Sequence, residues 1–163
     1  MTVLIRSITY ASLFSGLILV FLPAQVLSRS GVTWPTSFGV AQLAGMIVAA
    51  AGATIAVWCI LAFALVGHGT PAPFDPPRRL VVRGPYRVVR NPMYIAVTAL
   101  IAGQGLLFGS VTVLEYGAIV WAGFFLFVVA YEEPALGEQF ADEYKRYRAN
   151  VRRWLPRITP WRE

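Results

Sequence analysis

Charged residues are scarce in this sequence of 163 residues. They make up 13% of it, against about 25% in an average soluble domain, whereas 57% of the residues are hydrophobic. This composition excludes an ordinary soluble domain and favours a protein that lies in lipid.

Cysteine and histidine each occur once, as Cys59 and His68. A single cysteine excludes an intrachain disulfide, and we interpret Cys59 as an inert packing residue inside a helix. A single histidine excludes, within one chain, both a haem with two histidine ligands and a metal site with several histidines. We therefore predict no metal, and we keep His68 as a candidate general base.

Long apolar stretches dominate the rest of the chain. Crossing the hydrocarbon layer as a helix takes about 20 apolar residues, and four stretches meet that need: residues 7–27, 38–66, 92–109 and 111–131. We therefore predict an all-α integral membrane protein with four transmembrane helices, forming a single membrane domain over residues 1–163. The first stretch is interpreted as a retained span, because it is longer than the roughly 7–15 apolar residues of a signal-peptide core.

The basic residues are distributed unevenly between the spans. Of the 14 lysines and arginines, five lie in residues 78–90 and seven in residues 145–162, whereas the 109–111 connection has none. Basic connections face the cytoplasm, so both termini are predicted to lie on the cytoplasmic side of a bacterial inner or plasma membrane. We assign the net charge of +6 to contact with anionic lipid headgroups and predict no nucleic-acid partner.

Local signals set the helix boundaries in the first part of the chain. Small residues recur every four positions in the second span, which predicts a face for close helix packing; they are Ala41, Gly45, Ala49 and Ala53. Residues 67–91 are rich in proline and arginine and predict a cytoplasmic loop. The third span is predicted to begin at Asn91 and Pro92, with the Asn91 side chain capping free backbone N–H groups.

A second boundary falls at Glu132, Glu133 and Pro134. A residue before proline is disfavoured in the helical region, so we predict a bend near Glu133 and a new helix over residues 134–151. This helix is amphipathic, with apolar side chains at three- or four-residue steps: Leu136, Phe140, Tyr144, Tyr147 and Val151. It should lie along the membrane surface or cover the loop.

Three motifs in the second half of the chain occur in a fixed order. They are the run Arg83-Gly-Pro-Tyr-Arg-Val-Val-Arg-Asn-Pro-Met-Tyr94, then Glu132-Glu-Pro-Ala-Leu136, then Tyr144 and Tyr147. Over about residues 67–157 the chain resembles the isoprenylcysteine carboxyl methyltransferase and phospholipid methyltransferase superfamily. It departs from the common pattern at Asn91, where many members have histidine, and at Ala96, where glycine is frequent.

The resemblance implies a multi-span enzyme that binds S-adenosylmethionine at the cytoplasmic face and methylates a membrane lipid. Glu132 or Glu133 would pair with the ammonium of the cofactor, and Arg87 or Arg90 with its carboxylate. A tyrosine ring would face the sulfonium, and the candidates are Tyr86, Tyr94, Tyr144 and Tyr147. Tyr144 and Tyr147 are equally suited to anchoring at the membrane interface.

The remaining site residues follow from the same resemblance. Asn91 and Pro92 come with the first motif, and Gly103 and Gly105 resemble a Gly-x-Gly that phospholipid methyltransferases use near the cofactor. The catalytic candidates are Arg90, Glu133 and His68. The whole site requires that the arginine-rich run before the third span and the paired glutamates after the fourth meet in one place.

Several alternatives stay open at this point. The acceptor is either the carboxylate of an isoprenyl- or fatty-type lipid or the amine of phosphatidylethanolamine. Other functions consistent with the sequence are a reductase that binds NADPH, like the membrane sterol reductases, and a non-catalytic membrane scaffold, which the small-residue face of the second span would suit. The sequence does not determine the oligomeric state.

Overall fold

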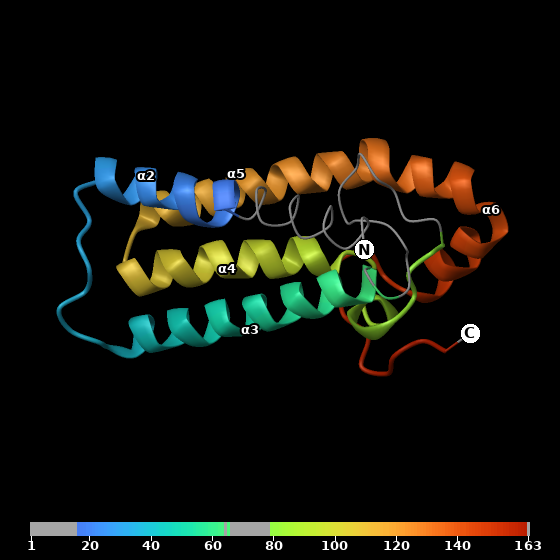
Figure 1. The fold of residues 1–163 in the computed structure, drawn as a ribbon, viewed down its shortest axis with the longest axis horizontal. Helices are drawn as coiled ribbons and strands as arrows, with labels where there is room; N and C mark the ends of the chain where they lie inside the picture. Colours follow the sequence, from blue (N-terminus) through green and yellow to red (C-terminus); the bar gives the residue numbers. More distant parts are fainter. Residues whose placement is uncertain (1–15, 64, 66–78, 163) are drawn as a thin grey trace.

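The fold is a bundle of long helices with an irregular region at one end (Figure 1). The computed structural model describes residues 16–63, 65 and 79–162, and these contain helices and connections but no strand. The helices are η1 (Gly16–Phe21), α2 (Leu22–Arg29), α3 (Val40–Ala62), η3 (Gly84–Arg87), α4 (Pro92–Phe108), α5 (Val111–Phe127), η4 (Val128–Glu132) and α6 (Glu133–Asn150). The all-α prediction is therefore confirmed for the described residues.

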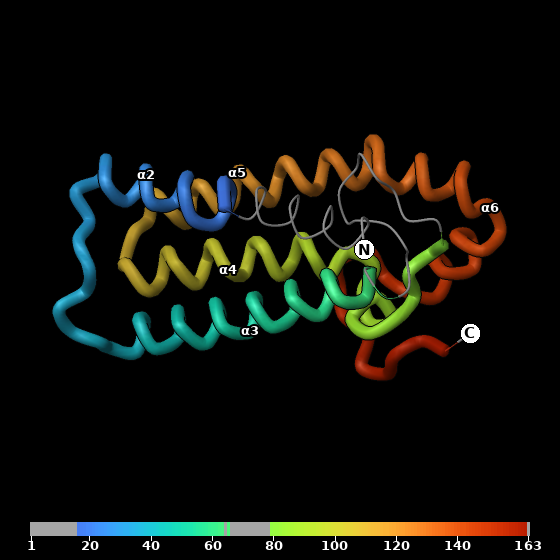
Figure 2. The backbone as a smooth tube through the Cα atoms, in the orientation of Figure 1, coloured from blue at the N-terminus to red at the C-terminus, as the bar shows by residue number. Residues whose placement is uncertain are grey.

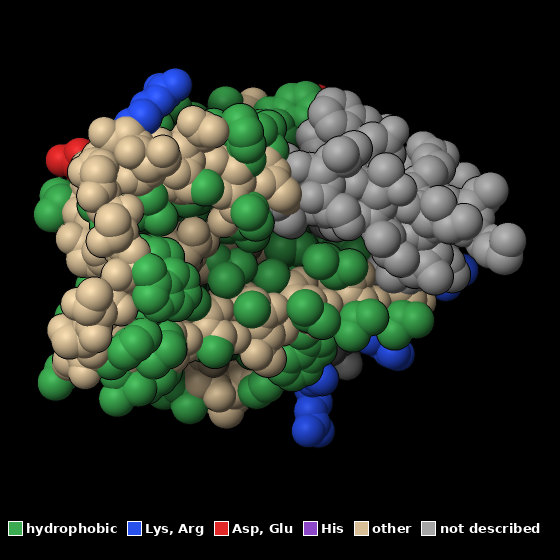
Figure 3. Space-filling view, turned by 60° about the vertical axis from the view of Figure 1, so that its left-hand side comes forward, with side chains coloured by type: hydrophobic (Ala, Val, Ile, Leu, Met, Phe, Trp, Pro, Cys, Tyr) green, Lys and Arg blue, Asp and Glu red, His purple; other side chains and the backbone are tan. Residues whose placement is uncertain are grey.

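Two helical stretches are long and apolar enough to cross a membrane. They are α3 and the continuous stretch Val111–Asn150, whereas Gly16–Arg29 and Pro92–Phe108 are apolar but shorter. Only 17% and 22% of the most apolar windows of the two long stretches are buried, although the core helix of a soluble protein is mostly buried. Figure 3 shows hydrophobic side chains over much of the visible surface. Such a surface fits contact with lipid.

Helices α3 and α4 pack backbone against backbone. A Cβ atom added to Gly45 would lie 2.7 Å from the carbonyl oxygen of Gly103, and one added to Gly103 would lie 2.6 Å from the backbone nitrogen of Ala49. Real Cβ atoms do not come this close to other atoms, so both positions require glycine at this helix separation. The predicted packing face is confirmed at Gly45 and Ala49.

Helix α4 begins at Pro92, as predicted, and ends at Phe108; the next residue is Gly109, whose φ of +60° suits a residue without a side chain. Ser110 then caps α5 by accepting a hydrogen bond from the backbone N–H of Val113. The predicted cap by Asn91 is wrong, because its side chain makes no capping hydrogen bond. Instead, its Nδ2 donates to the carbonyl oxygen of Arg153 at 3.2 Å.

The bend predicted at Glu133 is also wrong. Glu132 and Glu133 both have helical backbone angles, and the π-helical turn η4 joins α5 to α6. A π turn widens the helix just before Pro134, where the proline ring would otherwise crowd the preceding turn. The chain changes direction instead at Ala141, with φ of 38° and ψ of −112°. The tube in Figure 2 shows α6 turning back on itself.

Ala141 is the non-glycine residue with positive φ in the described chain, and this conformation costs an alanine about 1–3 kcal/mol. Ala141→Gly is therefore expected to raise the free energy of unfolding by about 1 kcal/mol, after allowance for the greater freedom of glycine in the unfolded chain. Thermal unfolding in detergent checks this. Ala149→Gly in the same helix is the control, and it should lower the free energy of unfolding. A lower stability for Ala141→Gly would contradict strain at the bend.

The apolar face of α6 covers the chain before η3. Tyr144, Tyr147 and Val151 are buried together with Leu80, and Trp161 packs against the same cluster. Of the two predicted positions for this helix, covering the loop is therefore confirmed. Because Tyr144 and Tyr147 are only 4% and 3% exposed, neither is free to anchor the protein at a lipid interface.

Candidate functional site

Residues 151–162 follow α6 without helical structure and lie against the segment that contains η3. Three backbone hydrogen bonds of 2.9 Å join the two segments: Arg90 N–H to Arg152, Arg157 N–H to Val88, and Trp161 N–H to Arg87. We call residues 151–162 the C-terminal arm. Through these bonds the arm holds the first motif in place, a role that the sequence patterns did not predict.

A cluster of three charged side chains, two buried and one partly exposed, lies where the arm meets the ends of α4 and α5. Arg90 Nη2 is 3.3 Å from Glu133 Oε1, and Arg153 donates to both Glu133 oxygens, at 2.8 and 2.7 Å. The Arg90 and Glu133 side chains are only 9% and 7% exposed. The predicted meeting of the arginine-rich run with the paired glutamates is therefore confirmed for Arg90 and Glu133.

This cluster carries an excess of positive charge. Burial raises the pKa of the Glu133 carboxyl, but the hydrogen bond from Arg153 and the charges of the neighbouring arginines outweigh it, so the pKa is lowered from 4.5. Glu133 is thus ionised at neutral pH and offsets one of two arginine charges. Arg90 Nε and Nη1 are buried and have no hydrogen-bond partner among the described residues. Unpaired buried donors on a cation are suited to binding an anion.

The lowered pKa of Glu133 predicts how stability depends on pH. A carboxyl with a lowered pKa stabilises the fold above its unfolded pKa, and this contribution is lost as the pH falls through its folded value. The difference in unfolding free energy between the wild type and Glu133→Gln should therefore be constant near neutral pH and shrink below about pH 4.5. Denaturation of both proteins between about pH 3 and 7 measures it. A difference that does not vary with pH would contradict this role of the ion pairs.

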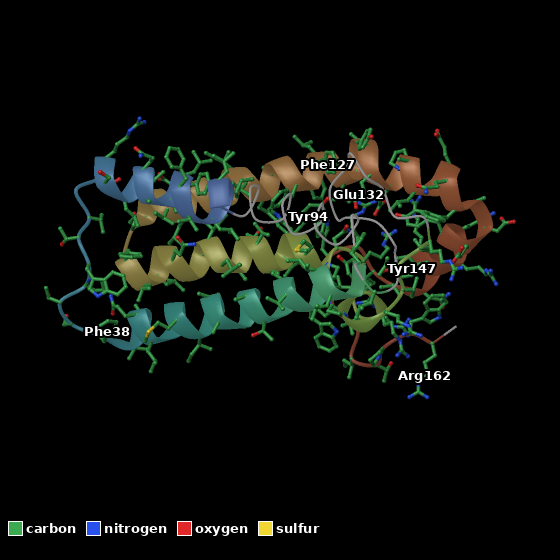
Figure 4. The ribbon with its side chains drawn as sticks, in the orientation of Figure 1. Phe38, Tyr94, Phe127, Glu132, Tyr147 and Arg162 are labelled. Atoms are coloured by element: carbon green, nitrogen blue, oxygen red, sulfur yellow. The ribbon has the colours of Figure 1, made fainter. Side chains whose placement is uncertain are left out.

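Glu132 faces a different partner from its neighbour. Its Oε2 accepts a 2.7 Å hydrogen bond from the Tyr94 hydroxyl, and the Tyr94 ring lies 4.7 Å from that of Phe124. Figure 4 shows Tyr94 and Glu132 near the end of the bundle opposite Phe38. No lysine or arginine of the described chain forms an ion pair with Glu132. Burial, together with the nearby charge of Glu133, raises the pKa of the Glu132 carboxyl, so a cationic group of a ligand would stabilise its ionised form.

The buried tyrosines around the cluster are neutral at physiological pH. Burial, reinforced by the charge of Glu133, raises the pKa of Tyr144 to about 12. Burial also raises the pKa of Tyr86 and of Tyr147. The Tyr147 hydroxyl donates a 2.6 Å hydrogen bond to the carbonyl oxygen of Tyr86, which joins α6 to η3. These tyrosines can donate hydrogen bonds or offer ring faces, but they do not act as phenolate bases.

A hollow of about 590 Å³ opens at the bend of α6 beside the charged cluster. Its walls include Glu133 and Tyr144, both predicted site residues, and Arg153. The other lining residues are Val129, Pro134, Gly137, Ala141, Asp142, Lys145 and Arg148. Its volume lies within the roughly 300–1,000 Å³ of sites for small ligands and cofactors.

Other predicted site residues have different surroundings. Arg87 donates through Nε to the carbonyl oxygen of Trp161 at 2.5 Å, so its guanidinium helps hold the arm. Tyr86 packs in a core cluster with Cys59, and Pro92 is buried at the start of α4. His68 lies outside the described residues.

Gly103 and Gly105 are not brought to the charged cluster. Gly103 lies eleven residues after Pro92 in α4, which is roughly 16 Å farther along the helix axis. Both lie in helix contacts: Gly103 against Ala49 of α3, and Gly105 against Leu114 of α5. Close packing therefore accounts for both glycines, and we do not carry them into the proposed site.

Arg153 is the main residue that the sequence patterns missed. It lies in a basic segment that the sequence patterns assign to membrane topology and to contact with lipid headgroups, and its carboxylate partner is 20 residues earlier in the chain. The spacing of the residues did not indicate this pairing, because the bend at Ala141 and the path of the arm bring the two together. Only the charge of Arg153 could have drawn attention to it.

Comparison with known proteins addresses the family of the chain. The phospholipid methyltransferase family model matches residues 40–143, which include α3, α4, α5, Arg90 and both glutamates. The chain belongs to the phospholipid methyltransferase family. An uncharacterised protein of Haemophilus influenzae is 31% identical over 70 residues, which cover 39% of this chain and all of that protein. No solved structure matches the chain significantly. Family membership makes this chain a membrane-associated lipid methyltransferase.

Proposed function

We propose that the protein transfers a methyl group from S-adenosylmethionine to a lipophilic acceptor at the cytoplasmic face of a membrane that it crosses four times, with both termini cytoplasmic. The observation that carries this proposal is Arg90, a buried cation with two unpaired donor atoms at one end of an apolar bundle. Glu132 lies at the same end of the bundle without an ion-pair partner among the described residues. An anion site and a cation site near each other suit an amino-acid group that carries both charges.

The surroundings of the two glutamates divide their roles. Glu133 is already paired with two arginines, so we assign it to holding Arg90 and Arg153 in place. Glu132 accepts a hydrogen bond from Tyr94, and we assign it to the ammonium of the cofactor. The free donors of Arg90 would hold the carboxylate. Tyr144 lines the adjacent hollow and is the tyrosine best placed to offer a ring face.

The cofactor, when bound, supplies a methyl group made electrophilic by the sulfonium and leaves as a neutral thioether. The protein contributes mainly by positioning, with Arg90 and Glu132 fixing the amino-acid end. A carboxylate acceptor would need no base, and a dry site would favour neutralisation of the two charges. An amine acceptor, as in phosphatidylethanolamine, would lose a proton, for which a glutamate or His68 is the candidate base.

Binding and product analysis test the proposed reaction. Titration of the purified protein with S-adenosylhomocysteine should show saturable binding, whereas titration with NADPH should show none. Incubation with a labelled methyl donor and a total lipid extract, followed by mass analysis, should identify one labelled lipid. Saturable NADPH binding without S-adenosylhomocysteine binding would favour a reductase and overturn the proposal. If a labelled lipid is found, the dependence of turnover on pH separates an amine acceptor, which must be unprotonated, from a carboxylate acceptor.

The division of roles between the glutamates gives a prediction of its own. Glu132→Gln should weaken S-adenosylhomocysteine binding by about 30-fold or more, because it removes the charge that pairs with the ammonium. Glu133→Gln should act mainly on stability, because it leaves the buried Arg90 and the partly exposed Arg153 without their carboxylate. Calorimetric titration and thermal unfolding of both variants measure the two effects. Unchanged affinity in Glu132→Gln would refute its assignment to the ammonium, and unchanged stability in Glu133→Gln would refute its assignment to holding the two arginines.

A further inference from the structure

The C-terminal arm exposes large apolar side chains although it is fixed to the protein. Ile158 is fully exposed at 102% and Leu155 is 64% exposed. Between them in the sequence, Arg157 donates its backbone N–H to the carbonyl oxygen of Val88. Beyond Ile158, the backbone N–H of Trp161 donates to the carbonyl oxygen of Arg87, and Arg87 Nε donates to the carbonyl oxygen of Trp161. The two apolar side chains are therefore held outward by an ordered backbone.

The charge of this region has a single sign. Between Glu143 and Glu163 the sequence contains seven lysines and arginines and no acidic residue. Arg153 is neutralised by Glu133 and Arg157 contacts the carbonyl oxygen of Asn150, but Arg152 and Arg162 are exposed and form no ion pair within the described chain. Apolar side chains and tryptophans interspersed with unpaired arginines are typical of segments that lie in a membrane interface.

The position of the arm fits the same surroundings. Figures 1 and 2 show the C-terminal segment off the axis of the bundle, at the level where α3 ends and α4 begins. The segment of η3, to which the arm is hydrogen-bonded, packs against the end of α3. At that level a bundle that spans the bilayer would be surrounded by lipid headgroups. The nearby end of α3 also has exposed apolar side chains, Trp58 and Leu61.

We propose that the C-terminal arm is a binding surface for anionic phospholipid headgroups. Leu155 and Ile158 enter the headgroup boundary, and Arg152 and Arg162 bind the phosphates. These four side chains are not among those assigned to the methyl-transfer site, although Arg153 of the same arm lines the hollow there. The proposal requires only that the bundle lies in a bilayer. Each arginine near an anionic surface strengthens such contact about fivefold.

Depth measurement with a nitroxide label tests this surface in the full-length protein. The label is placed at exposed Thr159 by Thr159→Cys, and the native Cys59 is fully buried and stays unlabelled. Glu143→Cys, on the exposed face of α6, provides the control position. Nanodiscs of phosphatidylcholine alone are compared with nanodiscs that contain about one third phosphatidylglycerol, and the label is probed with oxygen and with a water-soluble nickel chelate.

In the anionic nanodiscs, the label at residue 159 should be accessible to oxygen and shielded from nickel, while the label at residue 143 stays open to nickel. The double variant Arg152→Gln/Arg162→Gln should lower the ratio of lipid-bound to water-exposed arm by about 30-fold. High salt should also lower the ratio of lipid-bound to water-exposed arm, because it screens the attraction between the arginines and the phosphates. Equal nickel access at both positions in both membranes would overturn the proposal, as would an identical depth with and without phosphatidylglycerol. Shielding that depends on protein concentration would assign the surface to a second copy instead.

Discussion

Arg90→Ala is expected to weaken the binding of S-adenosylhomocysteine by about 30- to 5,000-fold, because truncating one partner of a buried charge pair costs about 2–5 kcal/mol. Arg90 has two buried donor atoms, Nε and Nη1, that lack a partner within the described chain. In the proposed site these donors hold the carboxylate of the cofactor. Isothermal titration in detergent measures the effect directly.

Two further variants separate binding from folding. Arg90→Lys keeps the positive charge but loses the fork of parallel donors, so its affinity should fall between those of the wild type and Arg90→Ala. Arg146→Ala removes an exposed arginine of α6 and should bind normally. The thermal unfolding temperature of each variant shows whether the protein still folds when Glu133 is paired with Arg153 alone. Wild-type affinity in a folded Arg90→Ala protein would rule out the proposed carboxylate contact.

The second large effect is expected at the contact between α3 and α4. Gly103→Ala should lower the free energy of unfolding by about 1–3 kcal/mol, because the added Cβ would meet the backbone of α3, which yields only if the helices separate. Gly45→Ala on the facing helix should have a similar effect for the same reason. Thermal unfolding and expression of folded protein provide the measurements.

Gly123 of α5 is the matched control. A Cβ added there has no atom within 4 Å, so Gly123→Ala should leave stability unchanged or raise it. The folded fraction of Gly103→Ala should also bind S-adenosylhomocysteine with wild-type affinity, since Gly103 lies away from Arg90 along α4. Weakened binding with unchanged stability would instead support the cofactor role that the Gly-x-Gly resemblance implied.

Much of the fold was predictable because it depends on local composition. Long apolar runs, the start of α4 at Pro92 and the small residues of α3 are all properties of short stretches of sequence. The bend was predicted at the wrong residue for an equally physical reason. Proline disfavours the helical region in the residue before it, but a π turn of five residues, η4, lets the helix pass Pro134.

The candidate site was predictable in part. The motifs correctly brought together Arg90 and Glu133, which lie 3.3 Å apart, but they did not distinguish the two glutamates. Adjacent residues of a helix point in different directions, and only their partners show that Glu133 neutralises arginines while Glu132 contacts Tyr94. Asn91 shows the same limit, because its amide contacts the arm in place of its own helix.

Sequence alone determined that this chain builds apolar helices and belongs with lipid, because hydrophobicity and glycine or proline content act within a few residues of each position. Tertiary structure decided where Ala141 turns the chain, that Arg153 reaches Glu133, and that Arg90 keeps donors to spare. Those outcomes depend on the path of the backbone between distant residues, and a charge finds its partner through that path rather than through its neighbours in the chain.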